Sequence, residues 1–291
     1  MRTLVLAASL SLFATLAIAA QTPEQAFKAS LVQDNKDWAM RPHAILKIQD
    51  AAYLGEGQSA NLIGVKGKPA SWHWGAGPGV LTASVKDGQP VVLKDGRALT
   101  PEEIAKGIPV DKDVDIAGYP TQVNAGVLGA RFMIYNQQAA AARAFKGVDY
   151  FPYDPHYVVQ GTFKPDPRRP ARVFRTSRGT DKQFYHVGDA SFALNGKSFT
   201  LPFYADSDKP DAIKTMAAFF TDGLTGRGAY GSGRYVDIDS FGSFPPASVT
   251  IDFNYAYNPN CSRSAFFTCP IATDNLDTDV NAGERDPHAA H

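Results

Sequence analysis

Short apolar segments separated by turn residues recur along this chain, and they constrain its fold more than any other feature. Segments of strand length bounded by Gly, Pro or Asn are typical of β-strands joined by tight turns. The 25 glycines, 20 prolines and 18 phenylalanines agree with a mainly β class. Examples before residue 115 are AILKIQ, NLIGV, GVLTASV and PVVLKDG, and examples after residue 150 are HYVVQGTF, KSFTLPFYA, GRYVDID and SVTIDFNYA.

One helix is expected ahead of these strands. Thr22 followed by Pro23 and Gln25 is the pattern of an N-cap, a first-turn proline and a capping-box partner. It predicts a helix from Pro23 to about Ala39. The apolar residues near one face of this helix, which should pack onto a β unit, are Phe27, Leu31 and Trp38.

The strand pattern divides the chain into two β units behind this N-terminal helix, which with its flanks takes residues 21–42. Residues 43–125 predict a small β-sandwich, and residues 126–149 predict a linker or a connecting strand or helix. Residues 150–284 predict a C-terminal antiparallel β-barrel or sandwich. Residues 285–291 should form a flexible tail.

Residues 1–20 have the composition of a secretory signal peptide. A positive start at Arg2 precedes an apolar run from Leu4 to Ile18, and small residues follow at the cleavage positions. We therefore expect an exported, periplasmic or secreted protein. No later apolar run approaches the roughly 20 residues of a membrane span, so no span is expected in the mature protein. The formal net charge of zero gives no overall field that would attract nucleic acid.

Four motifs in the second half of the chain resemble a known family. They are RAFKGVDYFPYDPHYVV, GRGAYGSGRYVDID, IDFNYAYNPNCSRSAFFTCP and NAGE, in this order. Together they resemble the bacterial and archaeal family called domain of unknown function 1684. The resemblance implies a fold and candidate residues, but the family name states no activity.

Two departures from the family pattern bear on function. The N-terminal half of the family looks like a forkhead-associated-type sandwich, and here that likeness is weak. The recognition pattern of phosphothreonine readers is absent, so no phosphopeptide role follows. After the Cys-Pro step the family usually has a Glu-Asn-Arg-Leu-like element, whereas this chain reads DNLD at 274–277 and lacks the arginine.

The family motifs and strand alternation together indicate a polar cluster in the C-terminal unit. Arg234 shares a strand face with Val236 and Ile238, so its guanidinium needs a carboxylate or carbonyl partner. That partner can be the loop after Asn258, which the arginine would fasten, or a ligand anion. Alternation also places Arg234 and Asp252 on different faces. The candidate residues are Tyr230, Arg234, Asp252, Asn254, Tyr257, Asn258 and Glu284.

Three functions fit this cluster. The first is a binding or accessory protein with a polar cleft for a small anionic ligand. The second is a hydrolase of unrecognised type, with Asp252 or Glu284 as base and Arg234 as electrostatic stabiliser. The third is a structural envelope protein in which the same residues lock the C-terminal loop. A pocket that exposes these groups would favour the first two, and their mutual satisfaction would favour the third.

Cofactor and metal sites are not indicated. The GRGAYG segment at 226–231 matches a Gly-x-Gly-x-x-Gly pattern, yet a strand-like segment follows it where a dinucleotide site needs a helix. No set of histidines and cysteines has the spacing of a zinc site. Cys261 and Cys269 are separated by seven residues, and export would expose them to an oxidising compartment. A disulfide is therefore predicted, worth about 2.5 kcal/mol on the chain-entropy model.

Overall fold

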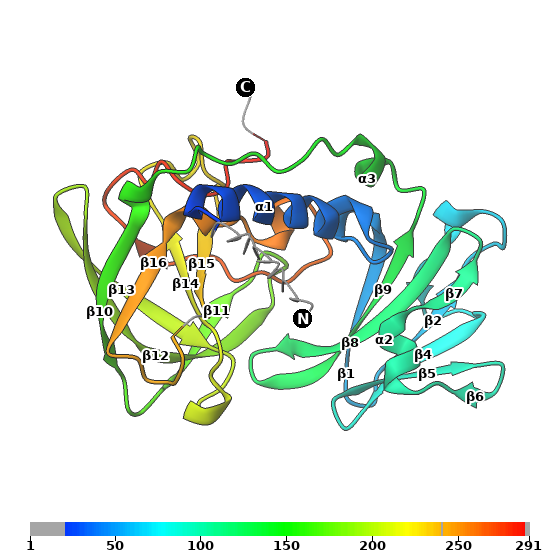
Figure 1. Cartoon of the computed structure of the whole chain (residues 1–291). Helices are drawn as coiled ribbons and strands as arrows, with labels where there is room; N and C mark the ends of the chain where they lie inside the picture. The colour runs from blue at the N-terminus through cyan, green and yellow to red at the C-terminus, as the bar shows by residue number, and fades with distance from the viewer. Residues whose placement is uncertain (1–20, 240, 289–291) are drawn as a thin grey trace, which may run out of the picture.

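The computed structural model describes residues 21–239 and 241–288 of the chain. The predicted signal peptide, residues 1–20, lies outside them. Figure 1 shows two β lobes side by side, with helix α1 (Pro23–Asn35) lying across them. The mainly β class, with an N-terminal helix followed by antiparallel sheets, is confirmed. Within the described ranges, no helix is both long and apolar enough to cross a bilayer.

The N-terminal lobe (residues 45–136) consists of two sheets around one apolar core. Leu62, Phe132 and Ile134 are fully buried between the sheets, and helix α2 (Pro101–Lys106) adds Ile104 to the same core. One sheet has the order β1 (Ile48–Gly55), β9 (Val127–Asn136), β8 (Val114–Asn124) and β7 (Ile108–Asp111). The other has the order β3 (His73–Gly75), β2 (Ser59–Ile63), β4 (Leu81–Lys86), β5 (Gln89–Lys94) and β6 (Arg97–Ala98).

The connection between the lobes is shorter than the predicted one over residues 126–149. Strand β9 lies within that range but pairs with both β1 and β8, so it is an inner strand of the N-terminal lobe. Gly126, with a φ of 68°, turns the chain between β8 and β9. The connection proper is the short helix α3 (Ala140–Ala144) and the extended segment that follows it.

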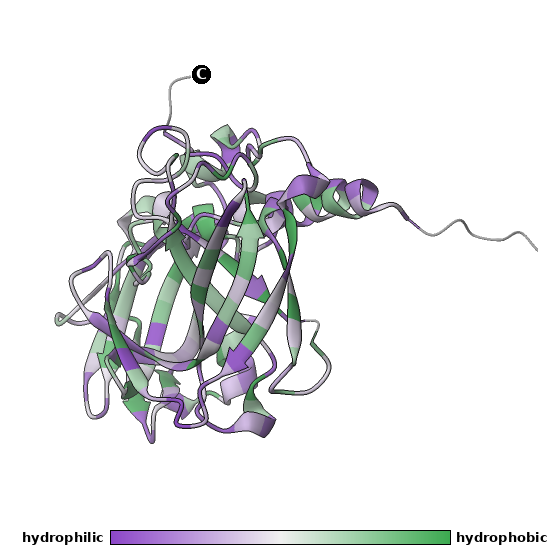
Figure 2. Cartoon of the chain, turned by 90° about the vertical axis from the view of Figure 1, so that its left-hand side faces the viewer, coloured by the Kyte–Doolittle hydropathy of each residue, from purple (hydrophilic) through white to green (hydrophobic). Residues whose placement is uncertain are grey.

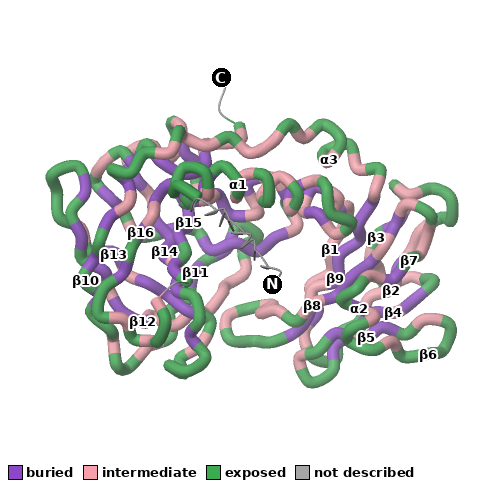
Figure 3. Tube along the Cα trace, viewed as in Figure 1, coloured by how far each residue is buried: buried purple, intermediate pink, exposed green. Residues whose placement is uncertain are grey.

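The C-terminal lobe (residues 150–285) is built on one curled eight-stranded sheet. Figure 2, which faces this lobe, shows apolar residues running along its strands, and Figure 3 shows buried stretches along the strands of both lobes, between exposed loops. The main path runs through β15 (Arg234–Ile238), β14 (Met216–Thr221), β13 (Lys197–Ala205), β12 (Asp181–Leu194), β10 (Val158–Pro165) and β16 (Ser248–Asp252). Strand β11 (Ala171–Arg175) pairs with β12, and β17 (Asp274–Asn275) pairs with β14.

Helix α1 begins where the sequence predicts. The Thr22 hydroxyl accepts a hydrogen bond from the Gln25 backbone N–H at 3.2 Å, and the Thr22 backbone N–H donates to Gln25 Oε1 at 2.9 Å. Phe27 packs against three tyrosine rings of the C-terminal lobe. The α-helix ends at Asn35, and a π-helical turn at Lys36–Met40 carries the buried Trp38.

The segment with both cysteines, which we call the cysteine loop (residues 259–272), joins the two lobes. Its Phe267 and Cys269 belong to the same apolar cluster as Met133 and Tyr135 of the N-terminal lobe. The Tyr53 hydroxyl also donates to the Phe266 carbonyl at 2.8 Å. The lobes are therefore held together through this loop as well as through α1.

We expect Tyr53→Phe to lower the free energy of unfolding by about 1 kcal/mol, the usual contribution of one hydrogen bond. The Phe266 carbonyl would lose its donor, while the ring would keep its place under the Arg178 guanidinium. Urea unfolding followed by circular dichroism measures the change. Tyr255→Phe is the matched control because Tyr255 is exposed. Equal stability of the two variants would contradict a joint at this contact.

Candidate functional site

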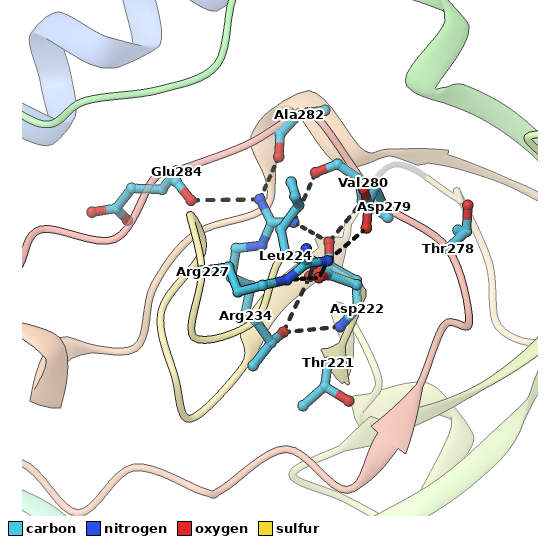
Figure 4. A network of polar contacts seen from close by, with 12 residues as sticks. Thr221, Asp222, Leu224, Arg227, Arg234, Thr278, Asp279, Val280, Ala282 and Glu284 are labelled. Carbon is cyan, nitrogen blue, oxygen red and sulfur yellow. Dashed lines mark hydrogen bonds and ion pairs between the residues drawn. The ribbon is translucent and has the colours of Figure 1, made fainter. Parts of the chain in front are cut away.

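Arg234 lies at the centre of a buried polar network in the C-terminal lobe (Figure 4). Only 1% of the residue is exposed. Its Nη2 donates to Asp222 Oδ2 at 2.6 Å and to the Val280 carbonyl at 3.0 Å. Its Nη1 donates to the carbonyls of Ala282 and Glu284. Both kinds of partner that strand alternation requires, a carboxylate and carbonyls, are present.

Asp222 is positioned by the turn that follows β14. Its Oδ1 accepts from the Leu224 N–H at 3.2 Å and from the Thr225 hydroxyl at 3.1 Å, and its Oδ2 also accepts from the Val280 N–H. Burial lowers the pKa of Arg234, and the adjacent Asp222 charge opposes that shift. The terminal nitrogens of Arg234 are thus engaged by the chain itself.

Glu284 belongs to a second buried network beside the first. Its Oε2 accepts from the Asn258 N–H at 2.8 Å, and its Oε1 forms an ion pair with Arg263. Burial raises the pKa of Glu284, while Arg263 acts in the opposite direction. The Asn258 side chain donates to the Arg285 carbonyl at 2.7 Å, so residues predicted as tail are anchored here. The network fastens the C-terminal segment onto the cysteine loop.

Asp252 and Asn254 form a turn rather than a shared site with Arg234. Asp252 Oδ1 accepts from the backbone N–H of Asn254 at 3.0 Å and from its side-chain amide at 2.8 Å. Asn254 also exchanges two hydrogen bonds with the Asp154 backbone. Burial raises the pKa of Asp252, and the bonds from Asn254 oppose the shift. This pair ties β16 to the start of β10.

The GRGAYG segment is part of a loop that leads into β15. Gly226 has a φ of 76°, and Gly233, just before the strand, has a φ of 87°. A Cβ on Gly233 would stand 2.7 Å from the Phe220 carbonyl oxygen, so glycine is required there. The prediction that no helix follows this motif is confirmed, because Arg234 begins strand β15. These glycines bring Arg234 close to β14.

A pocket of about 260 Å³ opens on the opposite face of the same sheet. Side chains alternate along β13 and β14, so Phe203 and Phe220 enter the main core while Tyr204 and Phe219 face this pocket. We call it the aromatic pocket. It is lined by the rings of Phe184, Tyr204, Phe219, Tyr235 and Tyr257, the carboxylates of Asp206 and Asp237, and Ala205, Thr215, Ala217 and Pro270.

The polar side of the aromatic pocket is acidic. The Tyr257 hydroxyl donates to Asp237 at 3.0 Å and 3.2 Å. Surrounding groups raise the pKa of Asp237, first through desolvation and then through the charges of Asp239 and Asp206, although the hydroxyl of Tyr257 opposes this. Asp237 itself is exposed to solvent. A ligand in this pocket would meet aromatic walls and two carboxylates.

The structure does not contain the disulfide predicted between Cys261 and Cys269, because both are free cysteines. The Cys261 backbone N–H donates to Cys269 Sγ at 3.3 Å. The loop is held by other bonds, including one from the Tyr235 hydroxyl to the Pro270 carbonyl and one from Ser177 Oγ to the Phe267 carbonyl at 3.1 Å. Its conformation therefore does not depend on a covalent link.

The seven candidate residues do not converge on one cavity. Arg234 and Glu284 are buried in adjacent networks, Asn258 joins the second, and only Tyr257 of the seven lines the aromatic pocket. Tyr230 lies beside Cys261, to which its hydroxyl is hydrogen-bonded.

The sequence alone did not reveal the partners of the two buried networks or most residues of the aromatic pocket. The missed partners are Asp222 and Arg263, and the missed pocket residues are Asp206, Asp237, Phe184, Tyr204, Phe219 and Tyr235. One signal in the sequence could have found Asp222. Because Arg234 needs a carboxylate or carbonyl partner, the acidic residues at the ends of neighbouring strands were candidates, and Asp222 is one of them.

In the part of the chain that the structure describes, no group of three or more His, Cys, Asp and Glu side chains is arranged to hold a metal ion. Four carboxylates and the two thiols are instead spread over separate networks, the carboxylates being those of Asp222, Asp237, Asp252 and Glu284.

Comparison with known proteins agrees with the family resemblance. The family model described as "Protein of unknown function (DUF1684)" matches residues 143–285. No curated protein matches the chain. One similar solved structure is the solution NMR structure of an uncharacterized protein of Haloarcula marismortui, which is 30% identical. The match covers 51% of this chain and 82% of that one, with a TM-score of 0.44. Through residues 143–285, which span the C-terminal lobe, the chain belongs to the DUF1684 family of proteins of unknown function.

Proposed function

We propose that this protein binds a small organic cation in the aromatic pocket. The observation that carries the proposal is the meeting of five aromatic rings and two carboxylates around one space of about 260 Å³. Ring faces attract ammonium groups, and carboxylates supply the compensating charge. Pockets that hold small ligands combine apolar walls with a few placed polar groups in this way.

The charge of the proposed ligand differs from the anion predicted from the sequence. An anion at Arg234 would have to displace Asp222 and three backbone carbonyls from a residue that is 1% exposed. The aromatic pocket instead presents Asp206 and Asp237. Lys182 is a cation within electrostatic reach of Asp206, and burial lowers the pKa of its amine. It does not line the aromatic pocket.

The two alternatives from the sequence are less well supported as whole-protein functions. A hydrolytic base at Glu284 would lie in a residue that is 1% exposed, and Asp252 is engaged in capping its own turn. The buried ion pairs of Arg234 with Asp222 and of Glu284 with Arg263 support a structural role for these residues in the lobe that carries the pocket. Export remains part of the proposal. The mass of protein purified from its own host tests it, because removal of residues 1–20 lowers that mass.

We expect benzylamine to bind the aromatic pocket in preference to benzyl alcohol or benzoate, three probes of similar shape and different charge. Ligand-observed NMR with the purified protein measures each affinity. Asp237→Asn should weaken benzylamine binding about tenfold, or about 1.4 kcal/mol, because one of two carboxylates is lost. Asp277→Asn, at a side chain that is 91% exposed, is the matched control.

Either of two results would count against the cation. Preferential binding of benzoate would support the small anionic ligand predicted from the sequence. Equal benzylamine affinity in the wild type and in Asp237→Asn would show that benzylamine does not bind in the aromatic pocket, since Asp237 is one of the two acids of that pocket.

A further inference from the structure

The two free thiols lie side by side at the joint between the lobes. Cys261 is half-buried at the 3-10 turn Asn260–Ser262, and Cys269 is 8% exposed. The Cys261 backbone N–H donates to Cys269 Sγ at 3.3 Å, and the two side chains are hydrogen-bonded to one another. A pair in contact, with one member reachable from solvent, has the arrangement that thiol exchange requires.

Hydrogen-bond donors gather around one sulfur of the pair. Cys261 receives hydrogen bonds from the Cys269 thiol and from the Tyr230 hydroxyl, and the Ser177 side chain lies beside it. Donors to a sulfur favour its thiolate form, which is the nucleophile. Ser177 is itself positioned by the Phe267 carbonyl and by the Cys269 N–H, so this surrounding belongs to the fold of the cysteine loop.

The two cysteines differ in acidity for a structural reason. The hydrogen bond from Cys269 is the largest cause that lowers the pKa of Cys261, to about 6. The same bond, together with burial, raises the pKa of Cys269. Of the two sulfurs, the more accessible Cys261 is therefore the one whose thiolate form is favoured, and the buried Cys269 is the one whose thiol form is favoured.

We propose that Cys261 and Cys269 form a peroxide-reducing thiol site, with Cys261 as the attacking sulfur and Cys269 as the resolving one. The Cys261 thiolate attacks one oxygen of hydrogen peroxide and the O–O bond breaks. This step gives a sulfenic acid and hydroxide, so sulfur is oxidised and peroxide is reduced. The Cys269 sulfur then attacks Cys261 Sγ, an S–S bond forms, and the sulfenic oxygen leaves as water with the Cys269 proton.

The resulting bond would be a transient product rather than a permanent staple. Because Cys261 is only half-buried, an external dithiol can reach its sulfur and return the oxidised pair to two free thiols. The inference is independent of the ligand proposed for the aromatic pocket, because neither cysteine lines that pocket.

Mass spectrometry of the full protein, reduced with dithiothreitol and then exposed to hydrogen peroxide, tests the site. The wild type should lose two hydrogen atoms as the pair oxidises. Cys269→Ser should instead gain one oxygen on Cys261, which dimedone traps, because no resolving thiol remains. Cys261→Ser should leave Cys269 unmodified over the same time.

The pH dependence of the oxidation rate separates this site from an ordinary exposed thiol. The rate should reach half its maximum near pH 6 in the wild type. Cys269→Ala should move that midpoint upward because it removes the main donor, whereas Cys269→Ser retains a donor and should move it less. Tyr230→Phe should also move the midpoint upward, because it removes one hydroxyl donor.

Three results would overturn the proposal. The first is equal oxidation of the two single serine variants. The second is absence of oxidation in the folded wild type. The third is an S–S bond that is already present in untreated protein and resists dithiothreitol until the protein is unfolded, since that is the behaviour of a structural disulfide.

Discussion

Replacing Arg234 with methionine is expected to lower the free energy of unfolding by about 3 to 5 kcal/mol, because it breaks a buried ion pair from one side. The Asp222 carboxylate, whose side chain is fully buried, would keep its charge without a counter-ion. The carbonyls of Val280 and Ala282 would lose their donor as well. Urea unfolding followed by circular dichroism measures the change.

Arg227→Met is the matched control for Arg234. Arg227 lies in the loop before β15, its side chain is 68% exposed, and it pairs with Asp279 at 3.4 Å. An exposed pair of this kind contributes at most about 1 kcal/mol. The double variant Arg234→Met with Asp222→Leu should recover part of the lost stability, because it removes both buried charges together.

The outcome for Arg234 also bears on function. A folded Arg234→Met variant as stable as the wild type would show that the network is not what holds the C-terminal segment. If that variant also bound benzoate less well than the wild type, the anionic ligand predicted from the sequence would be supported. The variant can also lose much stability while its folded fraction binds benzylamine as the wild type does. That result would show that Arg234 has a structural role and no part in ligand binding.

Local patterns were enough to predict the elements of this fold but not how they combine. The capping box at Thr22 and the strand alternation of GRYVDID depend on neighbours in sequence, so both could be predicted. The partner of Arg234 is twelve residues away across a β-turn-β connection, and its choice depends on the close approach at Gly233. The sequence predicts a connection over residues 126–149, which contain β9. Pairing with β1 and β8 makes β9 an inner strand, and this pairing is not visible in the local sequence.

The aromatic pocket required information that a single strand does not contain. Phe184, Tyr204, Phe219 and Tyr235 come from four strands, and their register brings the rings onto one face. The β-bulge at His186 to Gly188 changes which face β12 presents beyond it, so alternation counted along the sequence fails there. The cysteine spacing permitted a disulfide, but the spacing alone could not decide between a covalent bond and two hydrogen-bonded thiols.

Glu284→Ala should destabilise the protein by about 3 kcal/mol and should do so most strongly at acidic pH. The variant leaves the Asn258 N–H without its acceptor and Arg263, whose side chain is 10% exposed, without a hydrogen-bond partner that the protonated acid also supplies. Glu284→Gln keeps an acceptor for Asn258 and should lose less. Glu102→Ala, at an exposed position in the first turn of α2, is the control.

The sign of the pH dependence follows from the direction of the pKa shift. Burial raises the pKa of Glu284 above its value in the unfolded chain, so the folded protein binds the proton more tightly. Stability from this group is fully present below the unfolded pKa, about 4.3, and is lost as pH rises through the raised folded pKa, at about 1.4 kcal/mol per unit of difference. The gap in unfolding free energy between the wild type and Glu284→Ala should therefore shrink as the pH rises from about 4 toward neutral. A gap that widens instead would mean that attraction to Arg263 outweighs burial, and that the carboxylate is charged in the folded protein over this whole range.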